Sequence, residues 1–194
     1  GKKFAHNACT GNSAKLASED ITMRTGLMIG AGSDQDSSLE GLIKLSKRAE
    51  QAGFDNLWMA NVFSLDAITT LALIGRETSR IELGTAVVPS YPRHPAALAQ
   101  QCLTAAVACN GRFTLGLGLS HQLVIENMFG LSYDKPARHM KEYLQALLPM
   151  LNGEAAAHNG ELYRVNCKFD VPGFKPVPVI VAALGDTMLK LAGT

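Results

Sequence analysis

Short apolar runs alternate along most of the chain with segments in which apolar residues recur every three or four positions. Short uninterrupted runs are typical of buried strands, whereas the recurring pattern is typical of helices that bury one face. The predicted strands, in chain order, are Thr25–Ile29, Asn56–Ala60, Ile81–Val88, Phe113–Leu119 and Val177–Ala183.

A predicted helix follows each of these strands. The helical stripes lie within 39–52, 68–75, 98–109 and 140–151, and a fifth helix begins after Gly185. Asp66 stands where an N-cap is expected, and Gly53 where a helix would stop. A small polar hairpin around Leu162–Val165 is the one interruption of the rhythm.

Five strand–helix repeats predict parallel strands joined by right-handed crossovers. An open doubly wound sheet and a (β/α)8 TIM barrel both fit this order. No GxGxxG motif opens a helix after the first three strands and no Walker sequence occurs, so we favour the barrel. Only about the first five of its eight units are present, since a complete barrel takes about 250 residues.

Residues 1–20 are polar and without periodicity, and they make up most of a leader, residues 1–22, whose first residue is Gly1. We expect this leader to lie outside the barrel domain, as a disordered segment or one introduced by cloning. Residues 23–194 are then expected to form a partial barrel. If nothing completes it, its first and last strands are open edges, and we expect either a carboxyl-terminally truncated fragment or association with another chain.

Composition and charge narrow the function. The chain has 194 residues, 47% of them hydrophobic, which suits a folded domain with a sizeable core. With 18 Lys/Arg against 17 Asp/Glu, it lacks the basic excess of a nucleic-acid binder. No apolar stretch approaches the roughly 20 residues of a membrane span. We therefore expect a soluble protein.

The cysteines and histidines give no sign of a metal site. Cys9, Cys102, Cys109 and Cys167 lie far apart and show no CxxC or Cys/His spacing, so we expect reduced and mostly buried thiols. Reduced thiols fit a cytoplasmic protein. We predict no bound metal.

Several long blocks of the sequence resemble the luciferase-like monooxygenase superfamily, most closely its branch that uses the deazaflavin coenzyme F420. The blocks that carry the resemblance are 81–95 (IELGTAVVPSYPRHP), 98–101 (LAQQ), 111–121 (GRFTLGLGLSH), 130–139 (GLSYDKPARH) and 181–193 (VAALGDTMLKLAG). The resemblance covers roughly residues 23–194.

The resemblance implies a TIM barrel with its cofactor across the carboxyl ends of the strands, and an F420-dependent oxidoreductase that moves hydride to or from a small organic substrate. It also implies a bulged third strand, often with a cis peptide, here within Thr85–Val88. An FMN-dependent monooxygenase is one alternative. A shortened flavin-binding remnant without activity is another. Whichever of these functions holds, a homodimer is one option for the assembly of the chain.

Two residues are candidates for chemistry. His121 follows the fourth strand, where the resemblance implies a proton donor, and an imidazole can exchange a proton near neutral pH. His121 could instead only hydrogen-bond the cofactor's polar edge, or be an ordinary loop histidine. Asn61 ends the second strand where related sugar-phosphate dehydrogenases carry an acid, with a histidine matching Val62. Because an amide cannot accept a proton at neutral pH, that departure argues against sugar-phosphate oxidation.

Other positions are expected, from the resemblance, to bind the cofactor. They are Thr85, Ala86, Val87, Gly118, Ser120, Gly185, Asp186, Thr187 and Met188. The last four open the fifth helix, where backbone N–H groups attract a phosphate. Many relatives carry proline at the position of Asp186. The negative charge of the Asp186 carboxylate would repel a phosphate unless the side chain points away from it as a helix cap.

Three further expectations concern side chains near the site. Arg93 and His94 could line its mouth, or serve as surface charge and helix cap. Arg138 and Glu142, four residues apart, are expected to form an ion pair on one helix. We expect His139 on the solvated flank of that helix.

Overall fold

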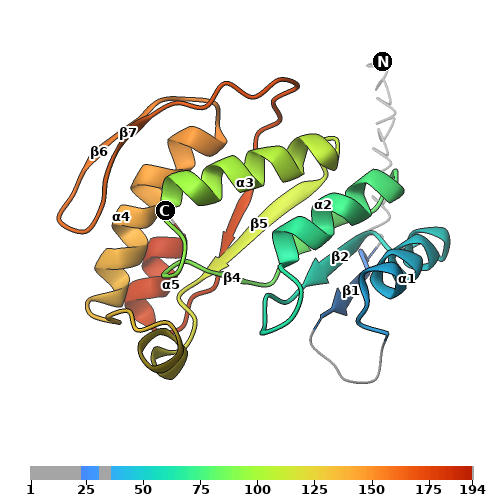
Figure 1. Cartoon of the computed structure of the whole chain (residues 1–194), viewed down its shortest axis with the longest axis horizontal. Helices are drawn as coiled ribbons and strands as arrows, with labels where there is room; N and C mark the ends of the chain where they lie inside the picture. The colour runs from blue at the N-terminus through green and yellow to red at the C-terminus, as the bar shows by residue number, and fades with distance from the viewer. Residues whose placement is uncertain (1–22, 31–35, 194) are drawn as a thin grey trace, which may run out of the picture.

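One parallel sheet with a layer of helices against it forms the body of the chain (Figure 1). The structure is a computed structural model that describes residues 23–30 and 36–193. The strands of this sheet are β1 (Gly26–Ile29), β2 (Asn56–Met59), β3 (Glu82–Thr85), β4 (Val88–Pro89), β5 (Phe113–Gly118) and β8 (Val179–Val181). The helices are α1 (Leu39–Gln51), α2 (Ala67–Glu77), α3 (Pro95–Ala108), α4 (Pro136–Leu151) and α5 (Asp186–Ala192). The expectations for the leader, residues 1–22, lie outside the described residues.

The strand order is that of five consecutive barrel units. β1, β2, β3 and β5 pair in that order, and β8 pairs with the other side of β5, always in parallel. Successive helices pack against one another in chain order, as Figure 1 shows for α1, α2 and α3. The predicted fold is therefore confirmed, as an arc of a (β/α)8 barrel that does not close: within the described residues, β1 and β8 each pair with one neighbour.

The third predicted strand is bulged. It forms β3 and β4, which both pair with β5. Gly84 pairs with Thr114 and Val88 with Leu117, so four steps along the third strand match three along β5. One extra residue against a regular ladder is a β-bulge. The peptide bond between Ala86 and Val87 within it is cis, as the resemblance implies.

Apolar residues of the sheet and of the inner helix faces form one core. Leu57, Leu83, Leu115 and Leu117 are fully buried on the strands, as expected for a parallel sheet covered by helices. The polar residues before the helices act as caps. Asp66 Oδ1 accepts a hydrogen bond from the backbone N–H of Thr69, and His94 Nδ1 accepts one from that of Ala96. Both satisfy N–H groups that a helix start leaves free.

Two features of the fold were not expected in this form. A π-helix, η1 (Val124–Met128), follows β5. The polar hairpin is longer than predicted, with strands β6 (Ala156–Asn159) and β7 (Arg164–Cys167) pairing antiparallel. The hairpin lies along α4 (Figure 1). No helix in the described part of the chain is both long and apolar enough to cross a membrane.

The prediction of an ion pair between Arg138 and Glu142 on α4 is wrong. Arg138 pairs with Glu161 at the turn of the hairpin, which Lys135 also contacts. Glu142 is buried under the hairpin, where its carboxylate accepts hydrogen bonds from the backbone N–H groups of Leu162 and Tyr163. These backbone donors lower the pKa of Glu142, the one from Leu162 most. Both side chains therefore bind groups of the hairpin and do not bind each other.

Candidate functional site at the carboxyl ends of the strands

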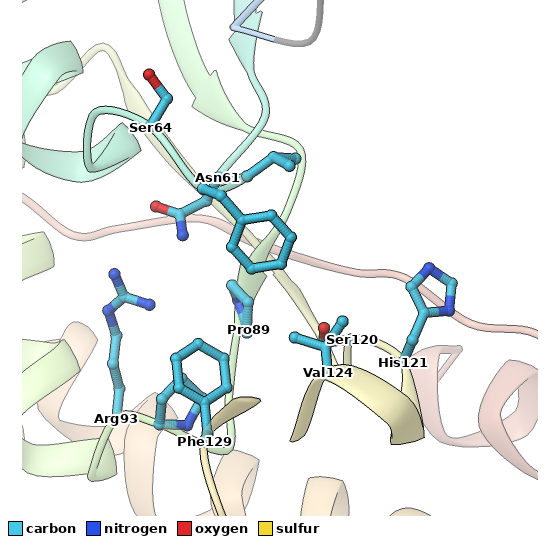
Figure 2. Close-up of a pocket in the computed structure, with 11 residues that line it drawn as sticks. Asn61, Ser64, Pro89, Arg93, Ser120, His121, Val124 and Phe129 are labelled. Atoms are coloured by element: carbon cyan, nitrogen blue, oxygen red, sulfur yellow. The ribbon is translucent and has the colours of Figure 1, made fainter. Parts of the chain in front are cut away.

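A cleft of about 570 Å³ opens where the strands β2, β4 and β5 end (Figure 2). This volume lies in the range typical of sites for small molecules and cofactors. The cleft is lined by Asn61, Val62, Phe63, Ser64, Pro89, Pro92, Arg93, Ser120, His121, Val124 and Phe129. Its lining is mostly apolar, with a few polar groups from three separate loops, which is the usual composition of such a site.

The loop after β2 supplies one wall of the cleft. Asn61 lies at its start, and its Oδ1 accepts a hydrogen bond of 3.0 Å from the backbone N–H of Ala67. The amide oxygen thus holds the beginning of α2, which leaves the amide N–H₂ to line the cleft. Val62 and Phe63 follow and are 52% and 68% exposed, so this loop offers apolar surface to a ligand.

The loop after the bulged strand supplies a charged group. Arg93 Nη2 donates to Asp66 Oδ2 at 2.6 Å, and both side chains are partly buried. The backbone carbonyl of Arg93 accepts a hydrogen bond of 2.9 Å from the hydroxyl of Tyr143 on α4. Burial alone would raise the pKa of Asp66, but Thr69 and Arg93 bond to its carboxylate, and the net effect lowers that pKa. Arg93 and Asp66 therefore form a partly buried ion pair, and Thr69 fixes the position of its carboxylate.

The third side of the cleft comes from the end of β5. Ser120 has a φ of 65°, a left-handed conformation uncommon for a non-glycine residue. The hydroxyl of Tyr133 donates to the carbonyl of Ser120 at 3.1 Å and so fixes this turn. His121 comes next, exposed at the cleft, and its carbonyl accepts the N–H groups of Val124 and Ile125 at the start of η1. In Figure 2, His121 and Arg93 lie at opposite ends of the cleft.

The predicted site residues fall into four groups, and the fourth, Thr85 with Gly118, lies below the site. Asn61, Ser120 and His121 line the cleft together. Ala86 and Val87 are half-buried in the bulge, just before Pro89. The run from Gly185 to Met188 follows β8 at the same edge of the sheet but does not line this cleft.

Thr85 and Gly118 form part of the support below the site. The Thr85 hydroxyl donates to the carbonyl of Gly116 and accepts from its N–H, both at 2.8 Å, and the residue is fully buried. A Cβ at Gly118 would lie 2.5 Å from Val87 Cγ2, so glycine is needed for the bulge to approach β5. Both residues were predicted at the site. They are buried beneath it and do not line the cleft.

The apolar lining of the cleft and the surroundings of His139 were not predicted from the sequence. Phe63, Val124 and Phe129 carry no motif that would mark them. His139 is wrongly expected on a solvated flank: it is 4% exposed and stacks on Tyr91, with ring centroids 3.7 Å apart. Its ring nitrogens share hydrogen bonds with Ser90 Oγ at 2.9 Å and with the Tyr163 hydroxyl at 3.3 Å.

The described cysteines Cys102 and Cys109 are buried and Cys167 is half-buried, all as free thiols, while Cys9 lies outside the described residues. Among the described residues no three His, Cys, Asp or Glu side chains gather as a metal would require.

Parallel strands that pair in chain order, helices that each pack on the next, and a cleft at the carboxyl ends of the strands define a protein of the (β/α)8 barrel class. Within that class, the chain belongs to the luciferase-like monooxygenase family, whose model matches residues 21–194.

The proteins to which the chain is similar include two reductases. Over 149 residues the chain is 33% identical to the 5,10-methylenetetrahydromethanopterin reductase of Methanolobus tindarius, covering 76% of this chain and 45% of that one. The coenzyme F420-dependent tetrahydromethanopterin reductase of Methanopyrus kandleri has a similar fold, with a TM-score of 0.73 at 24% identity over 88% of this chain and 53% of that one.

A third similar fold is the oxygenating constituent of 3,6-diketocamphane monooxygenase from Pseudomonas putida, solved in complex with FMN. Its TM-score is 0.70 at 19% identity, over 82% of this chain and 51% of that one. The chain spans about half the length of the curated relatives it matches.

Proposed function

We propose that this chain carries the cofactor-binding half of an F420-dependent oxidoreductase, which transfers hydride between the deazaflavin and a small organic substrate. The observation that carries the proposal is the meeting of Asn61, Ser120 and His121 around one cleft beside the bulged strand. Family membership adds the expectation of a flavin-type cofactor, and the relative from Methanopyrus kandleri is named as F420-dependent.

The residues present fit such a group. The cleft has a hydrophobic lining for a planar ring, and Asn61, Ser120 and His121 offer hydrogen bonds to the polar edge of a ring. Pro89, at the end of the bulged strand, adds an apolar surface between these polar groups (Figure 2). Bound F420 would supply the hydride carrier, while this chain's residues would bind the ring, limit its contact with water and handle protons.

We assign separate roles to the candidate residues. His121 would deliver or accept a proton at an imidazole nitrogen, at the open end of the cleft. Asn61 would donate a hydrogen bond from its amide nitrogen without changing its protonation state. Ala86 and Val87 would support the ring from the bulge. The backbone N–H groups of Gly185, Asp186, Thr187 and Met188 at the start of α5 would contact the phosphate of the cofactor, with the Asp186 carboxylate turned away from it.

A fluorescence titration with oxidised F420, run in parallel with FMN, tests the proposal. Val124→Trp and Leu123→Trp form a matched pair on adjacent positions, because Val124 lines the cleft whereas Leu123 is 73% exposed outside its lining. We expect saturable F420 binding, tighter than that of FMN, which Val124→Trp weakens at least tenfold and Leu123→Trp leaves unchanged. Equal and negligible binding of both cofactors would contradict the proposal, and preferential FMN binding would assign the cleft to a flavin instead.

The role of His121 is tested by His121→Gln, which keeps hydrogen bonding but not proton transfer at neutral pH. If His121 transfers the proton, F420 affinity should stay within about twofold while the rate of F420-dependent substrate reduction falls by roughly 100-fold or more. A loss of F420 affinity with an unchanged rate would instead make His121 a cofactor-binding residue.

A further inference from the structure

We propose that Arg93, held by Asp66, recognises an uncharged carbonyl oxygen on the substrate, which makes a neutral carbonyl compound with an apolar body the substrate class of this cleft. This inference rests on the proposed function, since it concerns the substrate of the same site. It is argued from residues that line the cleft, from the Asp66 carboxylate that pairs with Arg93, and from the groups that hold these side chains in place.

The guanidinium is held in place before any ligand arrives. Asp66 binds one of its N–H groups, and Asp66 is itself fixed by the backbone N–H and the hydroxyl of Thr69. The backbone of Arg93 is anchored through its carbonyl to the hydroxyl of Tyr143. An arginine whose guanidinium is held by a carboxylate and whose backbone is anchored loses less freedom when it binds a ligand, which favours recognition by hydrogen bonds.

The donors in this part of the cleft outnumber the acceptors. A guanidinium has five N–H groups and accepts no hydrogen bonds, and the Arg93 guanidinium donates one of them to Asp66. Asn61 uses its amide oxygen on the backbone N–H of Ala67, so its amide nitrogen keeps two N–H donors, one for the cofactor ring and one for a substrate oxygen. Figure 2 shows the two side chains extending toward each other at the same end of the cleft. Donors gathered in this way fit an oxygen acceptor.

The rest of the lining sets the other property of the ligand. Phe63, Phe129, Val124 and the prolines Pro89 and Pro92 give the cleft an apolar wall. A hydrocarbon or aromatic body would bury its surface there, while its oxygen met the donors.

Charge distinguishes a ketone or aldehyde from a carboxylate. Arg93 and Asp66 carry opposite charges, and the lowered pKa of Asp66 keeps its carboxylate ionised at neutral pH. A neutral carbonyl leaves this balance intact, whereas a carboxylate would add an uncompensated negative charge to a partly buried site.

Three ligands with one common phenylethyl body test this inference. 4-Phenylbutan-2-one carries a ketone, 3-phenylpropanoate a carboxylate, and 2-methyl-4-phenylbut-1-ene a CH₂ group in place of the ketone oxygen. Each is titrated into the ¹⁵N-labelled chain, with and without F420, while the Nε–Hε signal of Arg93 and the backbone signals around the cleft are followed by NMR.

We expect the ketone to bind at least tenfold more tightly than the alkene and to shift the Arg93 Nε–Hε signal, which is the scale of a hydrogen bond to a charged donor. The carboxylate should bind more weakly than the ketone. In Arg93→Met the ketone should lose its advantage over the alkene, whereas Arg76→Met, an exposed arginine on α2 outside the cleft, should bind all three ligands as the unmodified chain does.

Asp66→Asn provides a test that does not depend on removing the arginine. Asparagine is as good an N-cap as aspartate, so α2 keeps its cap, while the positive charge of Arg93 is no longer balanced. The order of affinities should then reverse, with the carboxylate above the ketone.

Equal binding of ketone and alkene to the unmodified chain would overturn the inference, as would an unchanged order of affinities in Asp66→Asn. These failures are distinct from a failure of the proposed function. Loss of the ketone pattern with F420 binding intact removes only the role of Arg93. Absent F420 binding removes the oxidoreductase, whatever the ligands do.

Discussion

His139 is a buried base whose neighbours are aromatic rings and hydroxyl groups. It stacks on Tyr91 and shares hydrogen bonds with Ser90 and Tyr163, and burial lowers its pKa from 6.5 to about 4. Because Ser90 directly follows Pro89 of the cleft, the imidazole ties the bulged strand to α4. We therefore expect it to remain neutral in the folded protein at neutral pH.

We expect His139 to make the free energy of unfolding fall in mild acid. The unfolded chain takes up a proton on His139 near pH 6.5, whereas the folded chain resists it until about pH 4. The stability is fully present above pH 6.5 and is lost as pH falls toward 4, by up to about 1.4 kcal/mol per pH unit. Urea unfolding at pH 7.0, 6.0 and 5.0 should show this slope, and His139→Gln should reduce it. An identical slope in the variant would contradict the assignment.

Among the secondary-structure elements, α4 holds the turn of the β6–β7 hairpin through the buried carboxylate of Glu142, in addition to the exposed ion pairs that Glu161 forms with Lys135 and Arg138. Glu142 accepts hydrogen bonds from the backbone N–H groups of Leu162 at 2.8 Å and of Tyr163 at 3.2 Å. Tyr163 in turn contacts His139, so the hairpin covers the helix flank on which that histidine lies. The hairpin thus shields a polar cluster that would otherwise face water.

Glu142→Leu should loosen this turn without unfolding α4. We expect amide hydrogen exchange at Leu162 and Tyr163 to become at least tenfold faster, because both N–H groups lose their acceptor. Exchange in the middle of α4 should change little. Glu154→Leu removes an exposed carboxylate just before the hairpin and is the matched control. Protection that persists at Leu162 and Tyr163 in Glu142→Leu would show that another group holds the turn.

The order of these elements could be predicted from local patterns, but several contacts could not. The five strands and five helices follow from apolar runs and helical stripes, and Asp66 caps α2 as its position predicts. The η1 segment has no apolar periodicity to reveal it. His139 and Glu142 were misplaced because a hairpin some 20 residues away covers them, and helical spacing carries no information about such a cover.

The candidate site was predicted to a similar extent. Asn61 and His121 could be named because they end two parallel strands, whose carboxyl ends meet at one edge, and because the resemblance marks both positions. The resemblance alone indicated Ser120. The resemblance, not the apolar pattern, indicated the bulge between Thr85 and Val88. The pairing of Arg93 with Asp66 joins two loops, and only the folded chain shows that it faces the cleft.

At the scale of the whole molecule, the sheet is an open arc. Within the described residues β1 and β8 each have one strand neighbour, and the region of β8 and α5 exposes large apolar side chains. Ile180 on β8 is 51% exposed and Leu184 just after it is 93% exposed. Unpaired strand edges with apolar side chains tend to bind further chains.

We accordingly expect the 194-residue chain to associate with itself at micromolar concentrations. Sedimentation velocity over a concentration series should show a mass that rises with concentration. Ile180→Lys should shift the series toward the monomer, since a charge on an edge strand opposes pairing. Leu73→Lys, on the exposed side of α2, is the control and should not. A monomer at every concentration would rule out association through this edge.

We propose that one cleft, formed by the loops after β2, the bulged strand and β5, binds the deazaflavin. Backbone NMR signals of the ¹⁵N-labelled chain, followed during addition of F420, test it most directly. We expect the largest shifts at Asn61, Ser120 and His121, and smaller ones at Ala86 and Val87. Shifts that gather elsewhere, such as between α4 and α5, or a spectrum that F420 leaves unchanged, would contradict it.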